Sequence, residues 1–279
     1  MQVPVLFGVF EIVLEILFFV FQVLIFRDSK RLLVVVWILL FIWKNWGFWA
    51  SLVMDPGFIT KGDKIGGQEF GDFDEKLFCQ VCSLNRPARS YHCKKCQRCV
   101  MIRDHHCYFI GNCVGYRNQR AFLVFLISYI IHSFISVFFT FFSLYRFPKT
   151  PANIGISFIM VFNLIVLDFF VFNQLIPQLR HLIRNETSIE FLKERNKSFE
   201  NSSTIVSSRY DTGSIMKNLR QRLGSNAFMW IFPLANDELL NDVVQNTDFI
   251  PLSEGDMSNM RTSPTEPLSA LRKRSYPRI

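Results

Sequence analysis

The sequence predicts an all-α integral membrane protein with four transmembrane helices and a cysteine-rich module between the second and third helices. Two observations carry this prediction. Half of the 279 residues are hydrophobic, and four apolar spans reach the roughly 20 residues needed to cross a bilayer. All seven cysteines lie between the second and third spans, in a stretch rich in basic residues.

The first two spans are expected at Val3 to Phe26 and at Leu32 to Met54, so that residues 1–54 form a helical hairpin. No basic segment and no small-residue cleavage site accompany the first span, which argues against a secretory signal peptide. The Asp-Pro-Gly triplet that begins at Asp55 ends the second helix, because these three residue types stop helices and turn the chain.

The loop between the second and third spans, residues 55–120, has the ligand pattern of a zinc-binding module. Two CxxC pairs are interleaved with histidines, and such knuckles supply the thiolate and imidazole ligands of tetrahedral zinc. A disulfide framework is the alternative, but it needs an oxidising compartment and is typical of short secreted chains. The long apolar spans on both sides of the cysteines favour zinc.

The number of ligands leaves one cysteine and one histidine over. Two closed zinc sites take four ligands each, whereas the stretch from Cys79 to Phe122 holds seven cysteines and three histidines. The natural surplus is His105 and Cys107, which stand two residues apart and follow Asp104. Histidine beside cysteine is the pattern of an activated nucleophile, and aspartate is the usual orienter of such a histidine. The alternative is that Cys107 is a spare ligand or inert.

The second pair of spans is expected from about Ala121 to Phe147 and from about Asn153 to Leu179, so residues 121–179 form another helical hairpin. A C-terminal region follows at residues 180–245. Residues 246–279 are polar and contain Pro and Ser, a composition typical of disordered tails.

Short elements are expected within the C-terminal region. Thr187-x-x-Glu190 is a capping box that begins a helix, and the polar stretch 196–208 is expected to be a loop. An aromatic run at 228–232 is expected at the membrane interface or against the helices. Before it, a short helix is expected with one apolar face and a glycine stop, formed by Ile215, Leu219, Leu223 and Gly224.

Basic residues predict the orientation in the membrane. The loop between spans two and three has eleven Lys and Arg, and the C-terminal region begins with Arg180 and Arg184. With four spans these two segments share one side, which the positive-inside rule makes the cytosol. The three basic residues of the segment 27–31 lie on the opposite side and argue against this orientation, but the larger loop outweighs them.

Several polar residues interrupt the apolar spans, and such groups usually face the interior of a helix bundle. Glu11 and Glu15 share one helix face, and helix packing is the favoured role for both and for Asn163, with a polar patch in a ligand cavity as the alternative. The remaining polar positions are Lys44, Asp168 and Asn173.

The spacing from Cys79 to Phe122 resembles, without a gap, the cysteine-rich domain of the DHHC-type protein S-acyltransferases, also called palmitoyltransferases. The resemblance implies that Cys107 of the Asp-His-His-Cys motif forms a thioester, with His105 as general base and later acid and Asp104 as its orienter. It also implies two structural Zn²⁺ ions, one held by Cys79, Cys82, His92 and Cys99 and the other by Cys93, Cys96, His106 and Cys113. The element that begins at Thr187 resembles the family's Thr-Thr-x-Glu element, with Ser188 in place of the second Thr, and residues 210–233 resemble its C-terminal element more loosely. In the family the transmembrane helices enclose the fatty chain, and His132 is a weak candidate for a residue at the far end of that cavity.

The function implied by the resemblance is transfer of a palmitoyl group from palmitoyl-CoA to cysteine thiols of cytosolic or membrane-associated proteins. Lys or Arg side chains are expected to bind the coenzyme A phosphates, and the candidates nearest to the membrane end of the module are Arg103, Arg117 and Arg120. The implied partners are long-chain acyl-CoA, the lipid bilayer, and protein substrates with accessible membrane-proximal cysteines. The implied location is the endoplasmic reticulum, the Golgi or the plasma membrane.

Two other classes of function stay open at the level of sequence. Two closed zinc sites and a tail would suffice for a membrane-anchored zinc scaffold or adaptor without acyltransferase activity, although the surplus Cys and His argue against it. Four spans with internal charges would suit a channel or transporter, against which the large loop module argues. The net charge of +8 would suggest nucleic acid in a soluble protein. In a membrane protein, topology and anionic cofactors explain this charge, so no nucleic-acid partner is expected.

Overall fold

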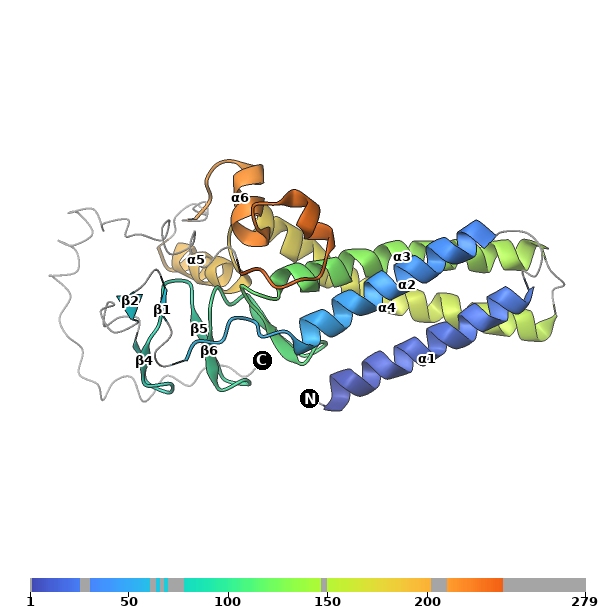
Figure 1. The fold of residues 1–279 in the computed structure, drawn as a ribbon, viewed down its shortest axis with the longest axis horizontal. Coiled ribbons are helices and arrows are strands. Elements are labelled where there is room, and N and C mark those ends of the chain that lie inside the picture. The colour runs from blue at the N-terminus through green and yellow to red at the C-terminus, as the bar shows by residue number, and fades with distance from the viewer. Residues whose placement is uncertain are drawn as a thin grey trace.

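The computed structural model describes residues 2–25, 31–60, 64–65, 68–69, 78–146, 150–201 and 210–237. In this part of the chain, four long helices extend from a smaller lobe of hairpins and short helices (Figure 1). They are α1 (Gln2–Ile25), α2 (Arg31–Val53), α3 (Gln119–Arg146) and α4 (Pro151–Ile183). The tail predicted to be disordered, 246–279, lies outside the described residues.

The described part of the chain contains three helices that are long and apolar enough to cross a membrane, and they confirm three of the predicted spans. The candidate spans are Val34–Val53, Gln119–Phe142 and Asn153–Ile183. The first predicted span is present as α1, a helix of 24 residues. Helix α4 continues to Ile183, beyond the expected end of the fourth span, although Pro177 lies inside it.

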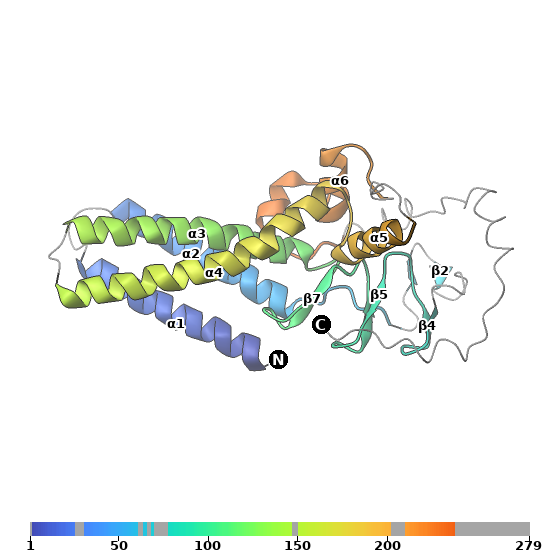
Figure 2. The same ribbon diagram turned by 180° about the vertical axis from the view of Figure 1, so that it is seen from behind.

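Helices α2 and α3 pack closely, and α4 covers α3 on its other side (Figure 2). A Cβ atom added to Gly47 of α2 would lie 2.8 Å from the backbone of Phe125 in α3, so the two backbones approach because position 47 has no side chain. In α1 the missing side chain of Gly8 instead leaves room for the ring of Phe48 from α2.

Ion pairs and hydrogen bonds link the polar residues inside the bundle. Lys44 of α2 bonds both carboxylate oxygens of Glu15 in α1, at 2.6 and 2.5 Å. Ser133 of α3 donates to Asp168 of α4 at 2.6 Å. Glu15 therefore has the packing role that the sequence predicts, because its charge is paired between helices.

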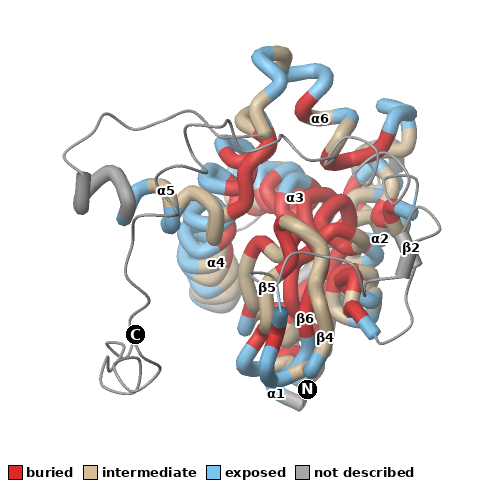
Figure 3. The backbone as a smooth tube through the Cα atoms, turned by 90° about the vertical axis from the view of Figure 1, so that its left-hand side faces the viewer, coloured by how far each residue is buried: buried red, intermediate tan, exposed pale blue. Residues whose placement is uncertain are grey.

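The module between α2 and α3 is a series of antiparallel hairpins whose strands are two or three residues long. The pairs are β1 (Lys64–Ile65) with β2 (Gln68–Glu69), β3 (Phe78–Cys79) with β4 (Leu84–Asn85), β5 (Tyr91–Cys93) with β6 (Arg98–Val100), and β7 (His105–Cys107) with β8 (Asn112–Val114). Buried segments lie at the centre of the end view in Figure 3, where the hairpins meet α3.

The C-terminal elements are α5 (Ser188–Asn201), α6 (Ile215–Leu223) and the 3₁₀ helix η2 (Ala227–Ile231). The predicted capping box is confirmed, since Thr187 N–H donates to Glu190 Oε2 at 2.8 Å and Glu190 N–H to Thr187 Oγ1 at 3.2 Å. The predicted end of α6 at Gly224, which has φ +100°, is also confirmed.

The loop predicted at 196–208 is wrong over residues 196–201, which belong to α5. Polarity alone suggested a loop there, but charged residues such as Lys and Glu are also good helix formers, and the capping box starts the helix upstream. The rest of that predicted loop, from 202 on, lies outside the described residues.

Candidate active site

The hairpins gather eight cysteine and histidine side chains into two clusters. In each cluster the possible ligand atoms all lie within 4.8 Å of one another. Strand register contributes directly, because His92 pairs with Cys99 and His106 pairs with Cys113. One cluster is formed by Cys79, Cys82, His92 and Cys99, and the other by Cys93, Cys96, His106 and Cys113.

The spacing within both clusters fits tetrahedral zinc. Sulfur atoms bound 2.3 Å from a tetrahedral zinc stand about 3.8 Å apart. The Sγ atoms of Cys82 and Cys99 are 3.7 Å apart, and those of Cys96 and Cys113 are 3.6 Å apart. In each cluster the histidine turns Nδ1 toward the sulfurs. Three thiolates and one imidazole form a complete donor set for a structural zinc ion, with no open coordination position.

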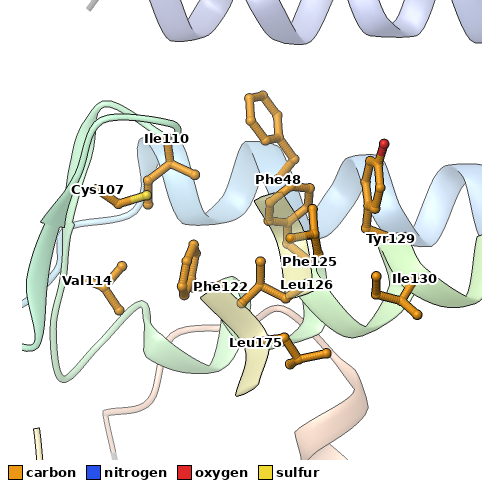
Figure 4. Close-up of a cluster of buried hydrophobic side chains, with 11 residues drawn as sticks. Phe48, Cys107, Ile110, Val114, Phe122, Phe125, Leu126, Tyr129, Ile130 and Leu175 are labelled. Carbon is orange, nitrogen blue, oxygen red and sulfur yellow. The ribbon is translucent and has the colours of Figure 1, made fainter. Parts of the chain in front are cut away.

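Cys107 belongs to neither cluster. Successive side chains of a strand point to opposite faces, so in β7 His106 turns to its cluster while His105 and Cys107 face the other way. Cys107 is only 6 % exposed, and its thiol joins a hydrophobic core that also holds Ile110 and Phe122 (Figure 4). The strand thus separates a metal-type histidine from a cysteine in apolar surroundings.

A cavity of about 450 Å³ opens beside Cys107 between the hairpin and the helices. Small-molecule sites in proteins usually enclose roughly 300–1,000 Å³, so this cavity has room for a ligand. His132, the weak sequence candidate for its far end, is not among the residues that line it. The lining includes His105 and Cys107 from β7, Phe122, Phe125 and Leu126 from α3, and Leu167, Phe170 and Val171 from α4.

His105 is held by Asp104 and faces Cys107. Nδ1 of His105 lies 2.8 Å from Oδ2 of Asp104. Nε2 is buried and has no hydrogen-bond partner among the described residues. Burial lowers the pKa of His105, but Asp104 and Cys107 outweigh burial and raise this pKa to about 9. The imidazole is therefore a strong acceptor for the proton of the Cys107 thiol.

Asp104 is 1 % exposed and is surrounded by hydrogen-bond donors from three parts of the fold. Ser188 donates from its backbone N–H to Oδ1 and from Oγ to Oδ2, both at 2.8 Å, and Gln178 donates to Oδ2 at 2.6 Å. Burial raises the pKa of Asp104, but hydrogen bonds from His105 and Ser188 outweigh it and hold this pKa well below its usual range. The carboxylate is therefore charged and fixed in place.

Sequence reasoning missed Gln178 and Ser188 as neighbours of the site. Ser188 carried a usable signal, because it lies beside the capping box and resembles a hydroxyl residue of the family's element there. Gln178 carried only a weak one, namely an amide near the end of an apolar span. A third missed residue, Arg89, bonds Glu190 at 2.8 and 2.9 Å and so ties the hairpin module to α5.

The three basic residues predicted to contact coenzyme A already have partners in the protein. Arg120 is buried and donates to the backbone carbonyls of Leu223, Leu234 and Ala235. Arg117 pairs with Asp237 at 2.8 Å. Arg103 donates from Nη1 to the carbonyl of His92 at 3.2 Å, and its Nε is buried without a hydrogen-bond partner among the described residues.

Comparison with known proteins places this arrangement in a family. The DHHC palmitoyltransferase family matches residues 72–195. Probable protein S-acyltransferase 13 of Arabidopsis thaliana is 28% identical over 252 residues, which cover 81% of this chain and 78% of that protein.

Two further relatives agree. Probable protein S-acyltransferase 12 of Arabidopsis thaliana is 30% identical over 234 residues, covering 76% of each chain. Palmitoyltransferase AKR1 of Gibberella zeae is 37% identical over 87 residues, covering 28% of this chain and 12% of that protein. The chain therefore belongs to the DHHC palmitoyltransferase family and is a protein S-acyltransferase.

Proposed function

We propose that the chain transfers a long-chain acyl group, palmitoyl, from acyl-CoA to protein cysteines through a thioester on Cys107. One observation carries the proposal: the cysteine and histidine left outside both clusters line the same cavity, together with apolar side chains of α3 and α4. A fatty chain in such a cavity gains roughly 0.8 kcal/mol for each buried CH₂ group. The apolar lining therefore supports a long-chain donor.

The first half-reaction uses Cys107 as nucleophile and His105 as proton carrier. The thiol proton of Cys107 moves to Nε2 of His105, whose Nδ1–H donates to Asp104. The Cys107 thiolate attacks the carbonyl carbon of acyl-CoA, forming a new carbon–sulfur bond as the bond to coenzyme A breaks. The coenzyme A thiolate leaves with the proton from His105. Asp104 keeps the imidazole in the required orientation throughout.

The second half-reaction repeats these steps with a substrate cysteine. His105 takes the proton of that thiol, the resulting thiolate attacks the Cys107 thioester, and the Cys107 sulfur leaves and recovers the proton. One thioester replaces another in each half-reaction, so no external energy source is required. A protonated His105 suits its role as acid, in line with its pKa of about 9.

The two clusters would hold structural zinc, each through the three cysteines and one histidine named above. Zn²⁺ with three thiolates supplies a rigid, closed tetrahedral centre. The hairpins are too short to fold on their own apolar content, so metal binding should provide much of their folding free energy. The clusters would thereby hold β7 at the mouth of the cavity.

We also propose that α1 is a fourth membrane span. Its apolar side chains face outward, for example Leu6 at 67% and Leu17 at 60% exposure, as expected for contact with lipid. Its Glu15 turns inward and pairs with Lys44. With four spans, the positive-inside rule supports a hairpin module and C-terminal region in the cytosol, in an endomembrane or the plasma membrane.

Arg103, Arg117 and Arg120 remain the proposed contacts of the coenzyme A phosphates. Arg117 and Arg120 would have to exchange a present partner for a phosphate. Arg103, whose Nε lacks a partner among the described residues, is the first to substitute in a binding test.

The decisive experiment is acylation of the purified protein with radiolabelled palmitoyl-CoA, comparing wild type with Cys107→Ser. Wild type should form a label that hydroxylamine removes, because thioesters are cleaved by this nucleophile. Cys107→Ser should form none while retaining its metal content, since Cys107 belongs to neither cluster. Label of equal intensity on Cys107→Ser would overturn the assignment of the nucleophile.

A further inference from the structure

A chain of buried polar side chains connects helix α6 to the carboxylate of Asp104. Its members come from α6, α3, α4 and the turn before β7, and none is more than 2 % exposed. They are widely separated in the sequence, so only the fold brings them together. In order they are Arg222, Gln119, Gln178 and Asp104.

Hydrogen bonds join each member to the next. Arg222 donates from Nε and Nη2 to the side-chain oxygen of Gln119, at 2.9 and 2.7 Å. The amide nitrogen of Gln119 lies 3.4 Å from the side-chain oxygen of Gln178. The amide nitrogen of Gln178 donates to Oδ2 of Asp104 at 2.6 Å.

The two ends of this chain fix the direction of every hydrogen bond in it. Arginine only donates, and an ionised aspartate only accepts. A glutamine amide can present either its oxygen or its nitrogen to a neighbour, so each glutamine has two orientations. Because Arg222 requires an acceptor, Gln119 must turn its oxygen to α6 and its nitrogen to Gln178. Gln178 must then turn its own nitrogen to Asp104.

A buried guanidinium is costly to maintain for packing alone. Replacing a buried charge by an apolar side chain of similar volume is often neutral or stabilising. Arg222 is instead fully engaged, since Nη1 also donates to the carbonyl of Glu186 at 3.1 Å. Its placement is explained if the protein needs a group at this point that donates and cannot accept.

We propose that Arg222 is a positioning residue for acyl transfer, which sets the amide orientations of Gln119 and Gln178 and thereby secures the hydrogen bond to Asp104. The inference rests on the proposed roles of Cys107, His105 and Asp104. Without Arg222, Gln119 is free to turn its oxygen toward the oxygen of Gln178, and the repulsion between these two acceptors displaces Gln178 from Asp104. Asp104 then holds His105 less well, although neither Arg222 nor Gln119 lines the cavity.

The test is single-turnover formation of the Cys107 thioester with palmitoyl-CoA, measured across donor concentrations. Arg222→Met should lower the rate constant at saturating donor by about tenfold to a hundredfold, the factor for one lost hydrogen bond to a charged group. The half-saturating concentration should not change. The matched control is Arg220→Met, the same substitution at an exposed position of the same helix, which should react like wild type.

A second variant separates orientation from stability. Gln119→Glu keeps an acceptor for Arg222 but, when ionised, has no N–H for Gln178. It should fold as well as wild type and react about tenfold or more slowly. It also decides the question if Arg222→Met fails to fold.

A wild-type rate constant in Arg222→Met or in Gln119→Glu would overturn the inference. So would a higher half-saturating concentration with an unchanged rate constant, because that result assigns Arg222 to donor binding. Cys107→Ser in the same assay keeps the two ideas apart. If it still forms the thioester, the proposed nucleophile is wrong; if it does not and Arg222→Met reacts normally, only the positioning role fails.

Discussion

Replacing Asp104 by asparagine changes one atom at the centre of the proposed site. The carboxylate accepts one hydrogen bond at Oδ1, from the backbone of Ser188. It accepts three at Oδ2, from His105, Ser188 Oγ and Gln178. In Asp104→Asn one oxygen becomes an NH₂ group, which opposes whichever donors it faces.

The geometry selects the less harmful orientation of the asparagine. An NH₂ at the Oδ1 position opposes a single N–H, whereas an NH₂ at the Oδ2 position opposes several donors. The carbonyl should therefore take the Oδ2 position, and His105 keeps its orientation but loses the charge of its partner. A hydrogen bond to a charged group is worth roughly 1 kcal/mol more than a neutral one, and weakened bonds from Ser188 and Gln178 add to the loss. We expect acylation to slow by about tenfold to a hundredfold.

Single-turnover acylation with saturating palmitoyl-CoA measures this loss, with zinc content determined on the same samples. His105→Ala should be slower than Asp104→Asn, because it removes the proton carrier itself. Glu194→Gln, a carboxylate-to-amide change on α5 outside the site, is the matched control. A wild-type rate in Asp104→Asn with metal retained would refute the orienting role. A rate constant lower by about 10⁴-fold, the loss expected when histidine is held in the wrong tautomer, would show that the asparagine takes the opposite orientation.

Four other outcomes are expected. Cys93→Ser should lose zinc and fold poorly, as measured by metal analysis and size exclusion, whereas Cys107→Ser should keep two zinc ions per chain. The pKa of His105 is raised from 6.5 to about 9 in the folded protein, so its stabilising effect is fully present below pH 6.5 and disappears as the pH rises through about 9. Thermal unfolding of wild type and His105→Gln should accordingly differ at low pH and converge above about 9; a constant difference would contradict this. Lys44→Met should destabilise the protein by about 3–5 kcal/mol by leaving the Glu15 carboxylate unpaired, and the double variant with Glu15→Gln should recover most of that loss in thermal unfolding. Asn196, an exposed residue in an Asn-x-Ser pattern, should carry no glycan if the C-terminal region is cytosolic, and a glycosidase-sensitive mobility shift would reverse the proposed topology.

Hydropathy and ligand spacing predicted the parts of this protein that depend on local sequence. The apolar spans predicted α2, α3 and α4 to within a few residues, because a bilayer crossing requires a continuous run of apolar residues. The capping box and the glycine stop of α6 are likewise local patterns. The prediction of a loop at 196–201 failed because polarity alone does not distinguish a surface helix from a coil.

The supports of the site could not be predicted in this way. Gln178 and Arg222 meet Asp104 and Gln119 only because four separate elements pack together. Each is an isolated polar residue that belongs to no periodic pattern or spaced motif, so the sequence does not indicate its role. The contact of Arg89 with Glu190 in α5 was also unpredictable from the sequence. The capping box already explained why a glutamate stands at position 190, so nothing pointed to a second partner for it.

The four adjacent side chains of the Asp-His-His-Cys motif lie in three different surroundings. His106 turns to a metal-type cluster, His105 and Cys107 turn to the cavity, and Asp104 is bonded to α4 and α5. A short strand can divide its side chains in this way only if its backbone is held rigidly, because a shift of one residue would exchange the two faces. With zinc bound, the second cluster would hold β7 through His106, and the donors around Asp104 hold the residue that precedes the strand. We therefore expect removal of metal to abolish acylation, although the proposed nucleophile is not one of the proposed zinc ligands. The motif would need adjacent residues because one rigid strand would present a metal ligand, the proposed proton carrier and the thiol together.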